Sequence, residues 1–458
     1  MTIARSHWGL RSLLLLLALC HSGWGLLSFP DLPGPYCETR RGQRCCDGRD
    51  DSCHVPILGT LCYCDEFCDR SAGGDCCPDF EPVCLGITRS PLEEIKTCTH
   101  EGFVYQRNDV VKKNCNACTC REDPSGKMVV VCDDKPCLIR ENIIDGVNRG
   151  NFGWRASNYS FLWGLTLDEG IERRTGTFKP EQLVVNMHSV DMNGGKALEE
   201  HFDARTNWPG FIQPIRDQGN CGSSWAISTV DTAADRHAIL TNGEEKMTLS
   251  AQQLISCHNK RQLGCKGGYI DRAWNYLKDK GVVSEECYPY TSGRNGTKGR
   301  CEVPPGIDPE FIQCPGGDAA EVYKSPPAYR ISSKERDIRV EIKKNGPVQA
   351  ILMVREDFYM YRSGVYKYAR LFPETPYAFR RSSLHSVRII GWGVDRSTGR
   401  EINYWLCANS WGRDWGENGY FRILRGTDES SIEMFVVAAW ASRMHPEDHH
   451  GGPNPNGK

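Results

Sequence analysis

The pattern of apolar and polar positions changes in character along the chain. In residues 224–240, SWAISTVDTAADRHAIL, apolar side chains recur at helical spacing with no glycine or proline, which predicts a helix. The segments 386–394 and 404–411, SVRIIGWGV and YWLCANSW, are rich in β-forming and aromatic residues and predict strands. MVVVC at 128–132 predicts a short strand after a turn at DPSG. A helical part followed by a strand-rich part predicts an α+β fold.

The N-terminus predicts a secreted protein. Arg5 and Arg11 precede the apolar run LLLLLALC at 13–20, and small residues follow it, as in a secretory signal peptide of residues 1–25. The run is too short to span a bilayer, and no other run approaches about 20 apolar residues. We therefore expect an extracellular protein without membrane insertion. Asn158 and Asn295 stand in Asn-x-Ser/Thr sequons and are the expected glycosylation sites.

The overall charge of the chain does not indicate a class of partner. The 458 residues include 56 Lys and Arg against 58 Asp and Glu, a net charge of −2, which offers no field for nucleic acid. We expect no cofactor and no metal. The tail, residues 443–458, is rich in Gly, Pro, His and Asn and is predicted to be disordered. Weak metal binding by His445, His449 and His450 is the alternative for this tail.

Cysteine spacing divides the chain into small modules and one large domain. Of 24 cysteines, one lies in the signal peptide, which leaves an odd number and at least one thiol free or paired between chains. Ten fall between Cys37 and Cys84, six between Cys98 and Cys137, and seven after residue 200. Small secreted modules with little apolar core depend on disulfides, so most of these cysteines are expected to be bridged.

The first cluster resembles a somatomedin B domain, which we assign to residues 33–88. The resemblance rests on LCYCDEFCDRSAGGDCCPDFEPVC, whose cysteines are Cys62, Cys64, Cys68, Cys76, Cys77 and Cys84. The cluster has two cysteines more than the usual eight, so a fifth bridge is expected, with its connectivity open. The resemblance implies a role in binding proteins.

The second cluster, NCNACTCREDPSGKMVVVCDDKPC with Cys98 before it, resembles a partial von Willebrand factor type C module at 95–140. A zinc site at Cys115, Cys118 and Cys120 is the alternative. Secretion favours disulfides over metal thiolates.

Six motifs in the large domain, residues 200–442, occur in the order found in papain-type cysteine peptidases of the cathepsin B branch. They are FDARTNWP (202–209), DQGNCGSSWA (217–226), CKGG (265–268), NGPVQA (345–350), LHSVRIIGWG (384–393) and YWLCANSWGRDWGENGYFRILRG (404–426). With cysteine-rich modules ahead of the domain and a serine where the nucleophilic cysteine is expected, the chain resembles the tubulointerstitial nephritis antigen family.

The resemblance implies two lobes, one helical and one β-barrel-like, with a cleft between them. It places Ser224 at the nucleophile position, His385 as its base partner, Asn409 as the residue that orients the imidazole, and Gln218 as the oxyanion donor. It implies three disulfides, Cys221–Cys265, Cys257–Cys301 and Cys287–Cys314, and leaves Cys407 as a buried free thiol.

The chemistry of this set predicts a non-catalytic protein. A thiolate is the reactive species in such a site, and a serine hydroxyl does not ionise near neutral pH. His385 would have to remove the proton during attack, with an amide in place of a supporting carboxylate. The alternative is an active secreted endopeptidase that uses Ser224 or an unrecognised nucleophile. A third reading, a carrier for an apolar ligand, requires an empty cleft. The loop between Cys287 and Cys314 contains no histidine, which argues against exopeptidase activity.

Residues 141–199 resemble a shortened peptidase pro-segment. If the protein cannot process itself, this segment is expected to stay in the cleft, while partners bind elsewhere. Arg173-Arg174 is a candidate cleavage site for another protease. Family resemblance suggests basement-membrane or other extracellular proteins, cell-surface receptors or secreted signalling proteins as partners. No RGD triplet supports integrin binding.

Overall fold

The computed structural model describes residues 32, 34–68, 75–87, 96–191, 197–303, 314, 320–371 and 382–440. They divide into two compact units, with the boundary between Lys96 and Thr97. The expected signal peptide and the tail at 443–458 lie outside the described residues. No helix among the described residues is long and apolar enough to cross a membrane.

The first unit is held together by disulfide bonds. Its secondary structure is a hairpin of β1 (His54–Ile57) and β2 (Thr60–Tyr63), a short 3₁₀ turn (Cys37–Thr39) and a π-helical turn (Glu81–Leu85). Leu58 and Gly59 join the strands, both at positive φ, as a two-residue turn requires. Five disulfides surround Phe80, so the expectation of a fifth bridge is confirmed; they are Cys37–Cys64, Cys45–Cys84, Cys46–Cys53, Cys62–Cys77 and Cys68–Cys76.

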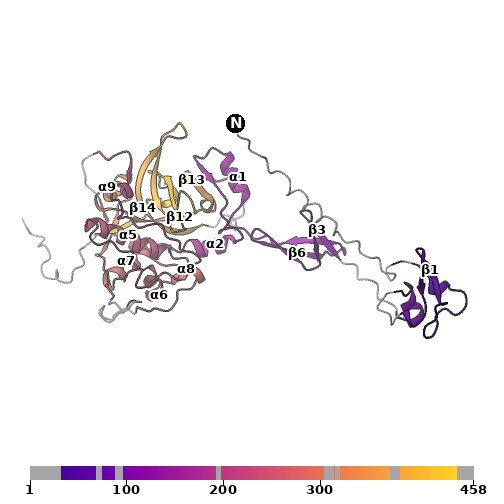
Figure 1. Ribbon diagram of the computed structural model, residues 1–458. Coiled ribbons are helices and arrows are strands. Elements are labelled where there is room, and N and C mark those ends of the chain that lie inside the picture. Colours follow the sequence, from indigo (N-terminus) through magenta and orange to yellow (C-terminus); the bar gives the residue numbers. More distant parts are fainter. Residues whose placement is uncertain are drawn as a thin grey trace, which may run out of the picture. The chain divides into compact units, whose positions relative to one another are not determined.

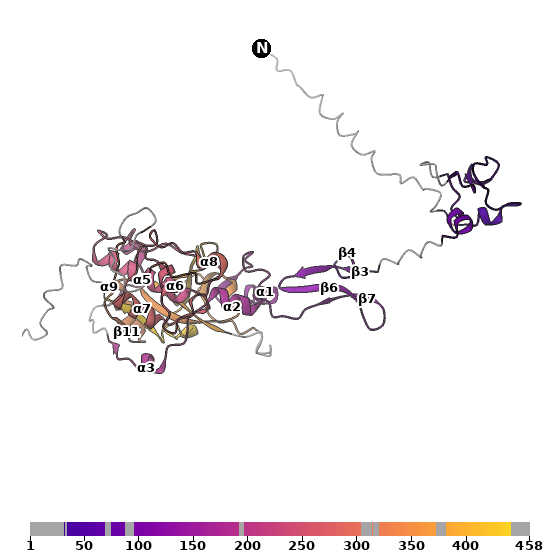
Figure 2. The same cartoon turned by 90° about the horizontal axis from the view of Figure 1, so that it is seen from below.

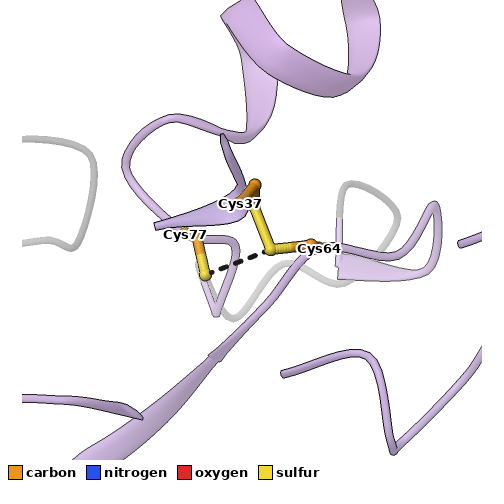
Figure 3. A group of neighbouring side chains, drawn as sticks. All are labelled: Cys37, Cys64 and Cys77. Atoms are coloured by element: carbon orange, nitrogen blue, oxygen red, sulfur yellow. Dashed lines mark hydrogen bonds between the residues drawn. A yellow bond between two sulfur atoms is a disulfide. The ribbon is translucent and has the colours of Figure 1, made fainter. Parts of the chain in front are cut away.

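Three sulfur atoms at the centre of this unit lie within 4.8 Å of one another, those of Cys37, Cys64 and Cys77. Figure 3 shows the Cys37–Cys64 bond with Cys77 beside it. Because Cys77 is itself bonded to Cys62, none of these sulfurs is a free thiolate that could ligate a metal. The cluster is a packed disulfide core.

The second unit begins with a β-rich module. A hairpin of β3 (Thr97–His100) and β4 (Phe103–Gln106) precedes a three-stranded sheet of β5 (Val110–Lys113), β6 (Asn116–Glu122) and β7 (Met128–Cys132), as Figure 2 shows. The strand predicted at 128–132 is therefore confirmed. The disulfides are Cys98–Cys120, Cys115–Cys137 and Cys118–Cys132. These bridges occupy all three cysteines of the zinc alternative, so the structure rules it out.

The helices of the papain-like part gather mainly on one side of its large sheet (Figure 1). They are α1 (Glu141–Arg149), α2 (Leu167–Arg174), α3 (Gln182–Val185), α4 (Ala204–Asn207), α5 (Ser224–Leu240), α6 (Ala251–Cys257), α7 (Ile270–Asp279), α8 (Ser292–Asn295) and α9 (Glu335–Asn345). The predicted helix is α5, with the bounds that the pattern indicated. Fourteen of its side chains are buried, which is why it carries apolar and small residues on every face.

A ten-stranded sheet forms the other lobe, in the order β8-β13-β16-β15-β14-β12-β17-β11-β9, with β10 paired to β14. Its strands are β8 (Trp154–Ala156), β9 (Ser189–Val190), β10 (Phe202–Asp203), β11 (Ala328–Ile331), β12 (Val348–Val354), β13 (Tyr361–Tyr366), β14 (Ser383–Asp395), β15 (Ile402–Ala408), β16 (Tyr420–Leu424) and β17 (Val436–Ala439). The strand predicted at 386–394 is part of β14, and the one predicted at 404–411 begins within β15 but extends past its end at Ala408; β14 and β15 pair antiparallel.

Two separate hydrophobic cores correspond to the two lobes. One surrounds α5 and contains Trp225 and Trp274, and the other lies on the sheet and contains Trp411, Trp415 and Phe421. The α+β, two-lobed fold is thus as predicted, preceded by small disulfide-rich modules. The N-terminus of α5 meets the first residues of β14 between the two cores. The candidate site lies at this meeting point.

Candidate functional site

The structure brings together the four residues expected at the active-site positions. Ser224 is the first residue of α5, His385 lies in β14, and Asn409 directly follows β15. The Ser386 amide lies 3.4 Å from Ser224 Oγ, which links the helix to the strand. Ser410, the residue after Asn409, connects Gln218 to this group. Its hydroxyl donates to Gln218 Oε1 at 2.8 Å, and its carbonyl accepts from the backbone N–H of Gln218.

The His385 imidazole is neutral. Asn409 Oδ1 accepts from the Ser410 amide and lies 2.7 Å from His385 Nε2, so Nε2 carries the proton. Complete burial lowers the pKa of His385 to about 4, against a smaller opposing effect of the Asn409 hydrogen bond. The unprotonated nitrogen is then Nδ1, which is buried and has no hydrogen-bond partner among the described residues. Nδ1 accepts no hydrogen bond from the Ser224 hydroxyl, which contacts other groups.

The Ser224 hydroxyl is directed to the chain preceding the domain. Its single proton has two acceptors within reach, the carbonyl of Thr175 at 3.2 Å and Thr177 Oγ1 at 3.0 Å. Thr177 also donates to Ser386 Oγ at 3.0 Å. Ser224 and His385 are both 0 % exposed. The hydroxyl therefore serves an internal network that contains no base.

Gln218, expected to stabilise an oxyanion, is used in the same way. Its Nε2 donates to the carbonyls of Arg173 and Thr175, at 3.0 and 3.1 Å, and to that of Cys221 at 3.1 Å. Backbone carbonyls thus stand where a developing negative charge would have to be placed. The Gln218 side chain is present, but its N–H groups already donate to the protein's own backbone.

Residues 173–178, named here the cleft segment, cross between the two lobes as an added backbone strand. The Thr177 amide donates to Leu384 O in β14, and the Phe178 amide donates to Gly268 O, while the Gly268 amide donates back to Gly176 O. Trp411 Nε1 donates to the carbonyl of Arg174 at 2.6 Å. The segment leaves α2, which begins with a capping box at Thr166.

A glycine allows the cleft segment to lie this deep. Gly176 has φ +115°, and a Cβ atom built on it would lie 2.0 Å from the carbonyl oxygen of Gly222. Gly222 is itself confined, since a Cβ there would lie 2.6 Å from both Cys265 O and Glu172 O. Two backbones therefore touch directly beside Ser224, which no larger residue at position 176 permits.

Arg174 anchors the segment and is not available for cleavage in this conformation. It is 5 % exposed, lies over the Phe161 ring and pairs with Asp217, with 3.0 Å between Nη1 and Oδ1. Burial lowers its pKa although the Asp217 carboxylate opposes that shift. Because a protease needs an extended, accessible backbone, the proposed dibasic site at Arg173-Arg174 is closed.

Comparison with known proteins defines the family of this site. The model of the papain family cysteine protease matches residues 198–440. The chain is 43 % identical over 444 residues to tubulointerstitial nephritis antigen-like from Mus musculus, which covers 93 % of both chains. It is 41 % identical over 423 residues to tubulointerstitial nephritis antigen from Homo sapiens, covering 89 % of this chain and 87 % of that one. This chain belongs to the tubulointerstitial nephritis antigen family of papain-like proteins.

The cathepsin B branch is the other point of similarity for this family member. Cathepsin B-like cysteine proteinase 4 from Caenorhabditis elegans is 35 % identical over 321 residues, 65 % of this chain and 91 % of that one. Among solved structures, procathepsin B S9 from Trypanosoma congolense is similar with a TM-score of 0.57 at 28 % identity, covering 66 % of this chain and 98 % of that chain.

The remaining site residues predicted for this family are also placed by the structure. The three disulfides of the large domain join the pairs that the resemblance implies, Cys221–Cys265, Cys257–Cys301 and Cys287–Cys314. Cys407 is free and buried, and burial raises its pKa well above the usual range. Asn158 and Asn295 are both exposed, as glycan attachment requires.

Sequence reasoning missed the residues that fill the site. Arg173, Thr175 and Thr177 hydrogen-bond to Ser224 or Gln218, and Gly176 lies against Gly222, but RRTGTF has no periodicity that marks it. The one available signal was the glycine between two threonines, in a segment already recognised as similar to a pro-segment. Its partner Gly222 could have been paired with it only through the fold.

Proposed function

We propose that this protein is a non-catalytic member of the papain family that acts outside the cell as a binding module. The observation that carries the proposal is the occupation of the site by the chain itself. Ser224 and Gln218 both bond to residues 173–177, and His385 Nδ1 faces no proton donor among the described residues. The extracellular setting fits the eleven disulfides among the described residues.

The chemistry of the site supports this independently of the cleft segment. A serine attacks only if a base removes its proton in the transition state, and the resulting imidazolium needs a counter-charge. Asn409 supplies a neutral amide oxygen, and burial already disfavours the imidazolium, since the pKa of His385 is about 4. In serine proteases the exchange of the supporting carboxylate for an amide lowers turnover about 10⁴-fold.

Turnover of peptide substrates by the purified full chain tests catalytic inactivity. The parent protein and Ser224→Ala are expected to be equally inactive. Ser224→Cys alone is expected to remain inactive because the cleft segment still covers position 224, and Ser224→Cys combined with Gly176→Val is expected to gain activity. Activity in the parent that disappears in Ser224→Ala would establish the alternative, an active endopeptidase that uses Ser224.

The binding role is proposed for the modules ahead of the papain-like domain as well as for its surface. Leu58, at the tip of the β1–β2 hairpin, is 78 % exposed, and Phe103 and Val104 of β4 are each 67 % exposed. Exposed apolar residues in small stapled modules favour contacts with other proteins. Basement-membrane proteins, cell-surface receptors and secreted signalling proteins are the partner classes we propose.

Solid-phase binding of the full chain to basement-membrane extract tests this role. Leu58→Asp and Phe103→Asp are expected to reduce binding while the disulfide pattern and unfolding midpoint stay unchanged. Thr60→Asp, exposed on the same hairpin but polar, is the matched control. If the apolar variants and the control bind equally, the modules are not the binding surface.

A further inference from the structure

A charged groove lies on the helical lobe, apart from the Ser224 site. It has a volume of about 760 Å³ and is formed between the loop after α6 and helix α7. The charged residues of its lining are Lys260, Arg261, Arg272, Lys278, Asp279 and Lys280. None of them contacts Ser224, Gln218, His385 or Asn409 in the hydrogen-bond network described above.

The groove is strongly positive although the chain as a whole is not. Five of its lining residues are cations and one is an acid, whereas the entire protein has a net charge of −2. Lys298 adds a further positive charge at the rim, because its Nζ lies 3.3 Å from Asn259 Oδ1. Lys260 and Lys280 are exposed and take part in none of the ion pairs found among the described residues. Such a local excess attracts anions from solution.

The fold holds these cations in place. Cys257, at the end of α6, is bonded to Cys301, which fixes the start of the loop. Arg272 lies over the Tyr269 ring at 4.3 Å and donates to the carbonyl of Lys260, so the loop is tied to α7. Lys278 and Lys280 are at the C-terminal end of α7, where the helix dipole favours positive charge. The charges are therefore a built feature of the surface.

A buried histidine supplies unused hydrogen-bonding capacity at the same place. His258 lines the groove but is only 8 % exposed, and its ring packs on Tyr276 with 5.0 Å between centroids. Its Nδ1 has no hydrogen-bond partner in the part of the chain that the structure describes. Buried polar groups are normally paired, so this nitrogen is an unused hydrogen-bonding position beside the lining cations.

We propose that this groove binds a sulfated polysaccharide of the glycosaminoglycan type. The ligand must be anionic, and an extended one can reach both Lys260 in the loop and Lys278 and Lys280 at the end of α7. Sulfate groups keep their charge at every physiological pH, and such chains are extracellular. The inference deepens the proposed extracellular binding role and rests on it.

The composition of the groove favours a polysaccharide over an acidic protein. Binding energy in protein interfaces is concentrated in Trp, Tyr and Arg, and lysine is depleted there. Here three of the five cations are lysines, and Tyr276, the aromatic residue of the lining, is buried. Contacts between cations and anionic groups dominate polyanion binding and make it salt-dependent.

A residue just after the cleft segment reduces the positive charge of this groove. Glu181, three residues after the cleft segment, pairs with Arg272 at 2.6 Å and with Arg261 at 3.3 Å. One carboxylate therefore neutralises part of the field of two arginines. Removing that carboxylate frees both guanidinium groups, so the affinity for a polyanion is expected to rise.

Heparin, as the sulfated probe, tests the proposal on the full-length secreted protein. Lys260→Glu combined with Lys280→Glu is expected to lower heparin affinity about tenfold near physiological salt and to flatten its dependence on salt. Glu181→Gln is expected to raise the affinity about threefold, by removing one local negative charge. Lys344→Glu combined with Lys367→Glu changes the net charge equally on exposed residues outside the groove, and should leave most of the affinity.

Each outcome decides the proposal. Equal losses in the groove variant and in the control variant would overturn it, as would undiminished binding to desulfated heparin or equal binding to poly-glutamate of matched length. Unchanged unfolding midpoints separate these results from misfolding. Turnover by Ser224 is measured separately and does not alter heparin binding, so failure of the non-catalytic proposal is distinguishable from failure of this one.

Discussion

The Ser224 cleft and the basic groove are opposite kinds of surface in one domain. In the cleft, the polar groups of Ser224 and Gln218 are buried and bonded to the protein's own backbone. In the groove, Lys260 and Lys280 are exposed and the space of about 760 Å³ is open. The contrast teaches that the residues similar to an active site already hydrogen-bond within the protein. The surface with charged groups free to bind a partner is the groove.

Two disulfides allow the contrast to be tested with the largest expected effect. Cys221–Cys265 borders the cleft, Cys257–Cys301 borders the groove, and both span 44 residues. Equal loops give equal loss of chain entropy, so replacing either pair by alanines is expected to lower the free energy of unfolding by about 4 kcal/mol. Urea unfolding of the secreted variants measures this.

The functional consequences of the two removals should differ. Loss of Cys221–Cys265 is expected to speed alkylation of a cysteine placed at position 224 and to leave heparin binding unchanged. Loss of Cys257–Cys301 is expected to weaken heparin binding and leave alkylation slow. If both removals affect both measurements equally, the two regions are not independent.

The large-domain elements were predictable because their signals are local. Helix α5 follows from the spacing in residues 224–240, and β14 and β15 follow from runs of β-forming residues. The four site positions and the three disulfide pairs followed from the resemblance to papain-type peptidases, whose motifs each carry the residue within a short stretch of sequence.

Features that depend on distant contacts were not predictable in this way. The depth of the cleft segment depends on backbone contact between Gly176 and Gly222, which lie 46 residues apart in the numbering. The groove combines cations from a loop and from both ends of α7, and Glu181 reaches it from the pro-segment-like region. Net charge near zero concealed this patch, because the acids that balance it lie elsewhere.

The next largest effect concerns pH and the cleft histidine. Burial lowers the pKa of His385 to about 4, below the ordinary value near 6.5, so the folded state prefers the neutral ring. The stability that neutral His385 provides is fully present above pH 6.5. It is lost as the pH falls toward 4, because over this range only the unfolded state takes up the proton. The loss amounts to about 3 kcal/mol over this range.

Urea unfolding between pH 7 and 4 of the parent and His385→Gln measures this effect. The variant keeps a donor for Asn409 and should show a pH dependence that is smaller by about 3 kcal/mol. His201→Gln, an exposed histidine, is the control and should retain the dependence of the parent. Identical pH profiles for the parent and His385→Gln would mean that His385 is solvated or charged.

A third test opens the cleft without changing its charges. Gly176→Val puts a side chain against the Gly222 carbonyl, so the cleft segment is expected to leave and alkylation of Ser224→Cys is expected to accelerate about 100-fold. Gly399→Val is the matched control, since Gly399 has a positive φ of +74° but open space around it. Cys407, free and buried, serves as the internal reference for slow labelling. Equal rates in both glycine variants would show that the segment does not cover position 224.

The smallest expected effect isolates the hydroxyl network around Ser224. Thr177 Oγ1 lies 3.0 Å from Ser224 Oγ, and a buried hydrogen bond of this kind contributes about 1 kcal/mol. Thr177→Val and Ser224→Ala should each reduce the free energy of unfolding, and the double variant should lose about 1 kcal/mol less than the sum. Thr232→Val, whose hydroxyl bonds within α5 to the Ser228 carbonyl, should instead be additive with Ser224→Ala. Additivity in the Thr177 pair would mean that the two hydroxyls do not interact, and that Ser224 is held by the Thr175 carbonyl and the Ser386 amide alone.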